Sequence, residues 1–325
     1  MKRYIVALDV MGSDKGPRIT LGGAKLALEK NEDLDLLLVG RIEEMEPIID
    51  ELSIDRDRIE LLDAQEVITN YDSPAAALFE KTRSSMVLAL DAVAKRDDVC
   101  GMVNASSTGA LIAGTLKYLP RENRVRPALA AILPAERGGF VCLVDTGATI
   151  DTTPAILQHF AYLGSELMRD MYGVENPRVG LLSNGAEETK GNKLVKETYP
   201  LLKDDAELNF VGNIEGSNAL SGDCDVLVAD GFAGNLVLKV TEGTARRVIT
   251  DIVRIAKSGH PEYMPLVMEL MKKYDIASLG GGIILGARKT VVKAHGAADE
   301  KAIMNTIGMV LNLAKNKSAF DTDNK

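Results

Sequence analysis

Short apolar runs alternate with longer amphipathic stretches along almost the whole chain. The apolar runs have the length and the branched aliphatic content of buried strands, and they lie at 4–9, 35–40, 59–63, 99–103, 128–133, 140–145, 178–183, 225–230 and 290–294. The stretches between them repeat apolar residues at helical spacing, and they lie at 19–30, 74–95, 108–119, 154–172, 189–202 and 236–257. Since helices that connect parallel strands cover both faces of their sheet, this order predicts a mainly parallel α/β sheet between two layers of helices.

Composition limits the classes of protein to which this chain can belong. Hydrophobic residues make up 46% of its 325 residues, which is enough to bury a large core. Lys and Arg number 38 against 47 Asp and Glu, a net charge of −9, and Trp is absent. No nucleic-acid partner is therefore expected, because neither phosphate-backbone binding nor base stacking is favoured. No apolar run approaches the ~20 residues of a membrane span, so we expect a cytoplasmic protein.

The cysteines and histidines indicate that no metal centre is present. Cys100, Cys142 and Cys224 each lie in or beside an apolar run, which favours buried thiols over a disulfide or a catalytic thiol. The histidines are widely spaced, and neither CxxC nor HExxH occurs. A dinucleotide fingerprint of the GxGxxG type is also absent. The sequence predicts neither a metal nor another cofactor.

Two polar turns follow predicted strands in the first third of the chain. In DVMGSDKGP, a strand gives way to a helix through Asp9, Gly12 and Asp14. In NASSTGA, a helix begins with Ser106, Ser107, Thr108 and Gly109. Parallel sheets bind ligands outside the carboxyl ends of their strands, and the free N–H groups at a helix start attract anions. The two turns are candidates for a phosphate site, with ordinary turn and helix caps as the alternative.

Four further turns carry groups suited to a polar substrate. They contribute Asp145 from DTGATID, Asn184 and Lys190 from SNGAEETKGN, Asp230, Gly231, Gly234 and Asn235 from DGFAGN, and His295 from KAHGAAD. Each turn alone has a simpler explanation, because a strand-terminal Asp often caps a turn and an exposed Lys is ordinarily solvated. Their succession at strand ends favours a ligand site.

The sequence also contains a series of motifs that resembles a known family. The motifs are DVMGSD, SSMVLAL, STGAL, RPALA, DTGATID, ETKGN, FVGNIEG, DGFAGNLVLK and KAHGAAD, in this order. They resemble the phosphate acyltransferase family of bacterial phospholipid synthesis, the PlsX type, from Tyr4 to about Leu313. The resemblance implies a Rossmann-like three-layer α/β/α fold of the isocitrate/isopropylmalate dehydrogenase type in one domain over 1–314. The polar residues 315–325 predict a flexible tail.

The resemblance further implies an activity and its partners. A homodimer would convert long-chain acyl-[acyl-carrier-protein] and inorganic phosphate into acyl phosphate, and a membrane glycerol-3-phosphate acyltransferase would take the product. The turn from Ser106 to Gly109 would hold the phosphate, which is itself the nucleophile. Candidates to stabilise the oxyanion on the thioester are Lys190, His295, Asn184 and Asn235. Substrate-binding roles are expected for Asp9, Gly12, Asp14, Asp145, Asp230, Gly231 and Gly234.

Several turns differ from the family's usual pattern. The first turn has Val10, Ser13 and Lys15 where the family usually reads DAMGGDHAP, and NASSTGA stands in place of SAGNTGA. A non-catalytic or weakened relative that binds acyl carrier protein as a scaffold is therefore the alternative hypothesis. A dehydrogenase of related fold would need clustered Asp residues for a metal and an Arg-rich pocket, and the sequence contains neither.

Acyl carrier protein is acidic, so a basic docking patch is expected on this acidic chain. One candidate patch consists of Arg246, Arg247 and Arg254 on a predicted helix. A second consists of Arg121, Arg124 and Arg126. The alternative for both is a solvated surface.

Residues 241–274 are predicted to form two consecutive helices outside the β–α alternation. The first presents Ile249, Ile252, Val253 and Ala256 on one face, and the second presents Met264, Val267, Met268 and Met271. A face that packs on the core and a dimer interface are the two main interpretations, and peripheral contact of the segment 258–264 with a membrane is a third. We expect a protruding helical pair that forms the dimer.

Overall fold

The computed structural model describes residues 2–120, 126–274 and 281–323. The chain forms two compact units: Met1–Pro127 together with Ala277–Lys325 make the first, and Ala128–Ile276 make the second. The single domain over 1–314 stays a prediction. The arginines Arg121 and Arg124 of the second candidate patch lie outside the described residues.

The first unit is built on a mainly parallel sheet with the strand order β3-β2-β1-β4-β11-β10. Its strands are β1 (Tyr4–Asp9), β2 (Leu34–Gly40), β3 (Ile59–Asp63), β4 (Val99–Asn104), β10 (Gly282–Leu285) and β11 (Thr290–Lys293). Neighbouring strands run parallel except β10 and β11. The last strand of the chain, β11, thus lies beside β4, which precedes it by almost two hundred residues. Because β1, β4 and β11 are adjacent and parallel, their carboxyl ends lie at the same end of the sheet.

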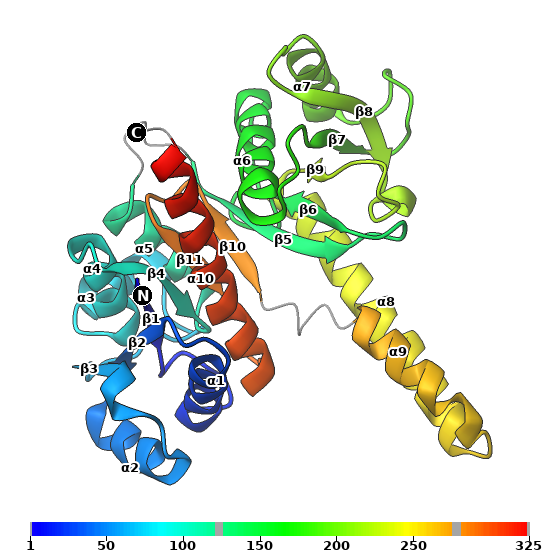
Figure 1. Ribbon diagram of the computed structural model, residues 1–325. Coiled ribbons are helices and arrows are strands. Elements are labelled where there is room, and N and C mark those ends of the chain that lie inside the picture. The colour runs from blue at the N-terminus through cyan, green and yellow to red at the C-terminus, as the bar shows by residue number, and fades with distance from the viewer. Residues whose placement is uncertain (1, 121–125, 275–280, 324–325) are drawn as a thin grey trace. The chain divides into compact units, whose positions relative to one another are not determined.

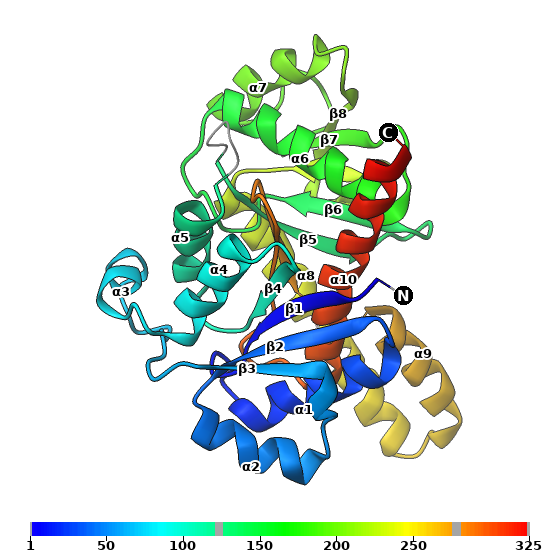
Figure 2. The ribbon, with the colours of Figure 1, turned by 60° about the vertical axis from the view of Figure 1, so that its left-hand side comes forward.

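Helices cover both faces of this sheet (Figures 1 and 2). They are α1 (Pro17–Lys30), α2 (Ile42–Leu52), α3 (Pro74–Glu80), α4 (Ser85–Lys95), α5 (Thr108–Tyr118) and α10 (Glu300–Asp323), with a short 3₁₀ turn, η1 (Arg56–Arg58). Helices α1 and α10 pack together on one face, and α4 and α5 cover the other. Gly23 lets α1 approach α10 closely, because a Cβ there would lie only 2.5 Å from the Ile303 side chain.

The second unit has a sheet of strand order β5-β6-β9-β7-β8. Its elements are β5 (Ala128–Pro134), β6 (Phe140–Val144), α6 (Pro154–Tyr172), β7 (Arg178–Ser183), α7 (Lys193–Lys203), β8 (Asn209–Glu215), η2 (Gly216–Asn218), β9 (Val226–Val228), α8 (Gly231–Lys257), η3 (Pro261–Tyr263) and α9 (Met264–Tyr274). β5 and β6 form an antiparallel hairpin, while β6, β9, β7 and β8 run parallel. The mainly parallel α/β fold that we predicted is thereby confirmed in both units.

Strand residues of the second unit alternate between two packed layers. Val144 and Val226 face α6, where Gly164 makes room for them. Leu143 and Leu227 belong to a buried cluster on the other face, against which Val237 and Leu238 of α8 pack. The first turns of α8 are therefore fixed by the core, as are the residues at its N-terminus.

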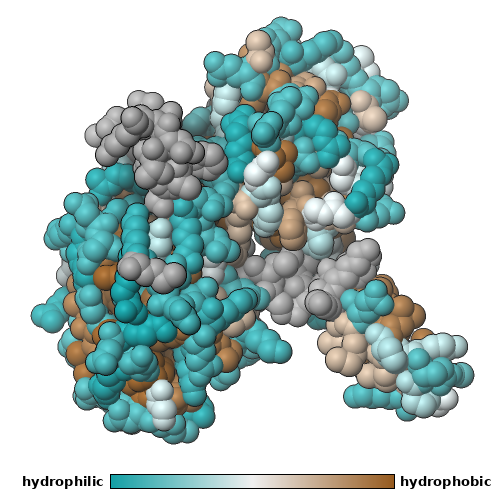
Figure 3. All heavy atoms as spheres, in the orientation of Figure 1, coloured by the Kyte–Doolittle hydropathy of each residue, from teal (hydrophilic) through white to brown (hydrophobic). Residues whose placement is uncertain are grey.

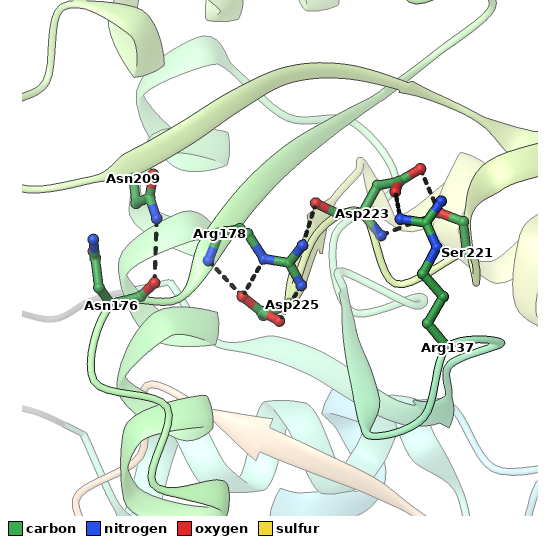
Figure 4. Close-up of polar contacts among 7 residues, drawn as sticks. All are labelled: Arg137, Asn176, Arg178, Asn209, Ser221, Asp223 and Asp225. Atoms are coloured by element: carbon green, nitrogen blue, oxygen red, sulfur yellow. Dashed lines mark hydrogen bonds and ion pairs between the residues drawn. The ribbon is translucent and has the colours of Figure 1, made fainter.

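An ion-pair network fixes the amino ends of β7 and β9, at the end of this sheet opposite the polar turns (Figure 4). The guanidinium of Arg178 donates to both carboxylate oxygens of Asp225, over 3.0 Å from Nε and 2.8 Å from Nη2. Nη1 of Arg178 also donates to the carbonyl oxygen of Asp223, whose carboxylate pairs with Arg137. Burial alone would raise the pKa of Asp225, but the hydrogen bonds from Arg178 more than offset it and lower the pKa. This fork-shaped pairing secures the strand starts, away from the polar turns.

Helices α8 and α9 form a pair that protrudes from the sheet of the second unit, as predicted (Figure 1). Ala256 and Val267, one from each predicted stripe, are both 1% exposed, so part of each stripe is buried where the two helices pack together. Met268 remains 66% exposed and Met271 46%. Figure 3 shows apolar residues at the surface of this pair. The pair thus buries only part of its apolar surface within the unit.

The structure corrects several predicted boundaries. The helix predicted over 74–95 is two helices, since Lys81 Nζ donates to the Val67 carbonyl and pairs with Asp72, and Ser84 caps the start of α4. None of β8, β10 and α2 was predicted from the sequence. Helix α10 continues to Asp323, past the start of the tail predicted at 315. The flexibility of that tail stays a prediction.

Candidate functional site

Polar residues end three neighbouring parallel strands of the first unit. Asp9 ends β1, Asn104 ends β4 and Lys293 ends β11. Leu8 is opposite Val103 and Lys293 is opposite Asn104, so the three terminal residues stand at the same level of the sheet. This edge is the one at which parallel sheets bind ligands.

Asp9 is the centre of a buried hydrogen-bond network at this edge. Its Oδ2 accepts from Asn104 Nδ2 at 2.6 Å, and its Oδ1 accepts from the backbone N–H of Met11 at 3.1 Å. Burial raises the pKa of Asp9 from its usual 3.8 to about 6, although the nearby Ser85 hydroxyl and hydrogen bonds from Met11, Asn104 and Gly12 favour the charged form. Asp9 is thus a carboxyl group that titrates near neutral pH within a predicted ligand turn.

The first two predicted turns meet around Asp9. Asn104 Oδ1 accepts from both the backbone N–H and the hydroxyl of Ser106, at 2.9 and 3.2 Å. A Cβ on Gly12 would lie 2.9 Å from the backbone nitrogen of Ser106, so only glycine allows this approach. Ser107 caps α5, because its hydroxyl oxygen accepts a long hydrogen bond of 3.5 Å from the backbone N–H of Ala110. The structure thus brings Asp9, Gly12 and Ser106 together at the start of α5.

The remaining residues of the SSTG turn lie further out. Ser106 and Ser107 are each 6% exposed, whereas Gly109 lies at the surface and Thr108 is half-buried. A Cβ on Gly109 would contact Pro74 of α3 at 3.0 Å. The turn therefore has a buried half beside Asp9 and an open half beside α3.

The turn after β11 is tied to the first turn. The backbone N–H of Asp14 donates to the Gly296 carbonyl at 3.0 Å, and a Cβ on Gly296 would meet the Asp14 carboxylate at 2.3 Å. His295 is exposed, and its Nδ1 accepts from the backbone N–H of Ala297 at 3.1 Å. Three of the predicted turns, at 9–14, 104–109 and 293–296, therefore lie together in the first unit.

In the second unit, Asp145 organises the turn after β6. Its Oδ1 accepts from the N–H groups of Leu129, Gly147 and Ala148, and its Oδ2 accepts from that of Thr149 at 2.6 Å. The side chain is fully buried, and burial raises its pKa, partly offset by these hydrogen bonds. All four donors are backbone groups, so Asp145 shapes its turn; a direct contact with substrate stays a prediction.

The start of α8 packs against that turn. Asp230 caps the helix by accepting from Ala233 N at 2.8 Å, and the N–H of Gly231 donates to the Thr149 carbonyl at 2.8 Å. A Cβ on Gly234 would lie 1.9 Å from the Asp145 carbonyl oxygen, which explains the second glycine of DGFAGN. Asn235 is exposed in the first turn of α8, beside Gly147. The turn DGFAGN thus packs against the turn DTGATID and supports it.

The loop after β7 lies on the same edge of the second sheet, because β6, β9 and β7 are parallel. Asn184 Oδ1 accepts from Gly191 N at 2.8 Å and closes the loop. The aliphatic part of Lys190 lies against Gly185, where a Cβ would be 2.6 Å from Lys190 Cγ. Lys190 and Asn184 are both exposed. The loop thus presents an amine at the carboxyl edge of the second unit.

The candidate docking arginines are exposed on α8, but they are partly neutralised. Asp251 pairs with Arg247 at 3.4 Å and with Arg254 at 2.9 Å. Arg246 contributes no ion pair of its own among the residues that the structure describes. The patch is therefore less basic than the sequence spacing suggested.

Two other kinds of site are absent from the part of the chain that the structure describes. No group of three or more His, Cys, Asp or Glu side chains in this part is arranged to hold a metal ion. Among the same residues, no helix has the length and apolar character needed to cross a membrane.

Sequence reasoning missed three residues of the first unit's edge. Asn104 appeared only as a departure from the family pattern, Ser85 only inside a motif, and Lys293 only as the first letter of KAHGAAD. The available signal was position, since each stands at a strand end or at a helix start. That signal is weak for a single residue, because the turns that follow strands are ordinarily rich in polar residues.

Known proteins are similar to this chain over most of its length. The profile of a family described as "Fatty acid synthesis protein" matches residues 4–319. A putative phosphate acyltransferase of Clostridium perfringens is 40% identical over 310 residues, covering 93% of this chain and 91% of the relative. A phosphate acyltransferase of Clostridium acetobutylicum is 37% identical over 321 residues, covering 96% of each. The chain therefore belongs to the phosphate acyltransferase family, as its motifs indicated, and is an acyltransferase.

Solved structures agree on the fold. A phosphotransacetylase from Streptococcus pyogenes matches with a TM-score of 0.66 at 15% identity, covering 97% of this chain and 94% of that one. A 4-hydroxythreonine-4-phosphate dehydrogenase from Klebsiella pneumoniae matches with a TM-score of 0.55 at 13% identity, covering 96% of this chain and 100% of that one. At such identities the likeness concerns the fold alone, and it confirms the Rossmann-like α/β class.

The pKa of Asp9 leads to a prediction about stability. Because the folded-state pKa is raised from 3.8 to about 6, the carboxyl contributes stability that is fully present below about pH 4 and is lost as the pH rises through 6. A shift of this size corresponds to about 3 kcal/mol. In Asp9→Asn this dependence should vanish. Urea unfolding followed by circular dichroism should therefore show the parent losing about 2.4 kcal/mol relative to the variant between pH 4 and pH 7.

The exposed Asp14 of the same turn provides the control for this experiment. Asp14→Asn should leave the parent's pH profile in place. Stability curves for the parent and Asp9→Asn that run parallel from pH 4 to pH 7 would contradict the assignment of a buried, high-pKa carboxyl to Asp9.

Proposed function

We propose that the protein transfers a long-chain acyl group from acyl-[acyl-carrier-protein] to inorganic phosphate. An oxygen of phosphate attacks the thioester carbonyl carbon, the carbon–sulfur bond breaks, and the thiolate leaves and takes up a proton from solvent. The product is an acyl phosphate. The thiol's ordinary pKa of ~8.5 makes it a good leaving group, so the reaction needs positioning and charge stabilisation more than a strong acid.

The observation that carries this proposal is the network at the start of α5. Asn104 joins Asp9 to Ser106, and this fixes the backbone of a helix start whose N–H groups have no partners within the helix. Such a start binds phosphate through its N–H groups and its dipole. We assign phosphate binding to the turn Ser106–Gly109, with Gly12 and Asp14 of the first turn as neighbours.

Separate donors in each unit suit the developing oxyanion. In the second unit, Asn235 and Lys190 present an amide and an amine at the carboxyl edge of the sheet, with Asn184 holding the Lys190 loop. In the first unit, His295 is exposed after β11. Groups fixed before the reaction stabilise charge without reorganisation, which is the largest single contribution in many acyl transfers.

The proposal extends to the partners. Arg246, Arg247 and Arg254 are assigned to docking of acidic acyl carrier protein, and the α8–α9 pair to a homodimer contact. Its tip at 258–264 is assigned to peripheral contact with a membrane, where a glycerol-3-phosphate acyltransferase would take the insoluble product. The exposed apolar residues of the pair support a contact of one of these kinds.

One assay tests the proposed reaction. Purified protein is incubated with palmitoyl-[acyl-carrier-protein] and phosphate, and acyl phosphate is trapped with hydroxylamine as the hydroxamate. We expect hydroxamate that depends on both substrates and is abolished by heat denaturation of the protein. If acyl carrier protein binds but no hydroxamate forms at any phosphate concentration, the chain is the non-catalytic scaffold of the alternative hypothesis.

A further inference from the structure

The first unit contains a buried cation that the proposed roles leave unused. Lys293, the last residue of β11, is 9% exposed. Burying an ammonium costs free energy, so lysines are rarely found at this depth. The Nζ of Lys293 donates a hydrogen bond to the carbonyl oxygen of Ala294, which keeps the amine at the carboxyl end of its strand. The fold thus holds a positive charge at the edge where the polar turns meet.

The sheet geometry places Lys293 in the row of polar residues at the strand ends. It is the register partner of Asn104 across the parallel pair β11–β4, and residues in register project from the same face of a sheet. Asn104 in turn donates to Asp9 at 2.6 Å. Carboxylate, amide and ammonium therefore follow one another across three adjacent strand ends, next to the start of α5.

The charges at this edge require a cation if phosphate binds there. Asp9 is fully buried and Asp14 belongs to the same turn, so the edge already carries two carboxyl groups. The neighbouring turn from Asn104 to Gly109 contains no charged residue. A phosphate dianion beside these groups would be repelled by the carboxylates unless a positive charge offset them.

A second buried polar group lies beside Asp9. Ser85, in the first turn of α4, is 0% exposed, and its hydroxyl finds no hydrogen-bond partner among the residues that the structure describes. The hydroxyl lies near enough to the Asp9 carboxyl to lower its pKa, yet it does not reach good bonding geometry. The Ser85 hydroxyl thus belongs to the buried polar surroundings of Asp9.

We propose that Lys293 is a phosphate-binding residue, whose ammonium supplies the positive charge that lets a phosphate dianion bind at the edge formed by Asp9, Asn104 and the start of α5. The inference rests on the proposed function and adds a residue to its phosphate site. Lys293 thus binds substrate directly, whereas Asn104 positions the turn.

The chain offers a matched control on the same strand. Lys289, just before β11 begins, also places its amine against backbone carbonyls, with Nζ 2.6 Å from Arg96 O and 2.9 Å from Val99 O. It lies at the opposite end of β11 from the polar row. Lys289→Met and Lys293→Met therefore remove equivalent side chains, but only the second removes one from the proposed site.

The test measures phosphate use and phosphate binding separately. In the acyl-transfer assay, Lys293→Met should raise the KM for phosphate by about 10–100-fold, since a hydrogen bond to a charged group is lost. Lys289→Met should leave that KM within about twofold. Lys293→Arg retains the charge and should recover most of the affinity. Lys293→Gln, which keeps a donor for the Ala294 carbonyl without the charge, should behave like Lys293→Met and replaces it if Lys293→Met does not fold.

Binding without turnover is followed by thermal unfolding in increasing inorganic phosphate, with sulfate-free buffer at constant ionic strength. Phosphate should raise the unfolding temperature of the parent and of Lys289→Met, and the effect should move to at least tenfold higher phosphate in Lys293→Gln. Equal phosphate dependence of Lys293→Gln and Lys289→Met in both measurements would overturn the inference. Phosphate stabilisation that depends on Lys293 without any acyl transfer would uphold the phosphate site and overturn the proposed reaction instead.

Discussion

Replacing Asp145 with alanine should destabilise the second unit by about 4 kcal/mol. Its carboxylate accepts hydrogen bonds from the backbone N–H groups of Leu129, Gly147, Ala148 and Thr149, and the side chain is fully buried. Each unsatisfied buried donor costs about 1–3 kcal/mol, and partial relaxation of the turn brings the total below the simple sum. This loss is a large fraction of the ~5–15 kcal/mol that stabilises a typical protein.

The asymmetry of the carboxylate gives this prediction a sharper form. Three of the hydrogen bonds reach Oδ1 and only the one from Thr149 reaches Oδ2. In Asp145→Asn, the amide oxygen can still accept the three hydrogen bonds that reach Oδ1. The NH2 group would then lie against the N–H of Thr149, where two donors oppose each other. We expect a loss of about 2 kcal/mol, roughly half that of the alanine variant.

Chemical denaturation followed by circular dichroism measures both losses, and Asp151→Ala is the control. Asp151 is exposed in the same stretch of chain, so its removal should change the free energy of unfolding by less than ~0.5 kcal/mol. Equal losses for Asp145→Asn and Asp145→Ala would mean that the Oδ1 hydrogen bonds contribute little, contrary to the structure.

The sequence predicted the α/β class because the strands at the centre of each sheet are continuous apolar runs. β1 and β4 are examples, and both were placed within a residue of their observed bounds. β8 was missed because an edge strand has one free side and needs no such run; its sequence NFVGNIE mixes polar and apolar residues. Edge strands are specified by pairing with their neighbour, here β7, and that information is not local.

The sequence also identified the polar turns at the strand ends, but neither their division between two units nor how each side chain acts there. Asp145 was expected to bind substrate, and the hydrogen bonds found for it are to the backbone of its own turn. Lys293 was overlooked because a lysine after an apolar run normally reaches solvent. Its burial arises only when β11, near the end of the chain, pairs with β4. Local sequence therefore identified the turns, and long-range pairing decides which groups are buried in them.

Replacing Asn235 with alanine should lower kcat by about 100–1,000-fold while leaving the fold intact. Asn235 lies in the first turn of α8, where the helix dipole favours negative charge, and its Cβ and Cγ are 4.0 Å from the position of a Cβ built on Gly147. The side chain is exposed, and it makes no hydrogen bond to any residue that the structure describes. Its amide is therefore free to donate to an oxyanion that forms during acyl transfer, and its loss should change the free energy of unfolding by less than ~0.5 kcal/mol.

Matched variants separate this role from simple recognition of substrate. Asn235→Asp has nearly the same shape but replaces the donor with an anion, so its kcat should fall at least as far as that of Asn235→Ala. Lys239→Ala, one turn further along α8, removes an exposed side chain paired with Glu242 and should leave kcat within about twofold.

Steady-state kinetics with varied acyl-[acyl-carrier-protein] at saturating phosphate measures these effects. An interaction made only in the transition state lowers kcat and kcat/KM together. A raised KM at unchanged kcat would instead assign Asn235 to binding of the acyl carrier protein substrate, and the oxyanion role would then have to lie with Lys190 or His295.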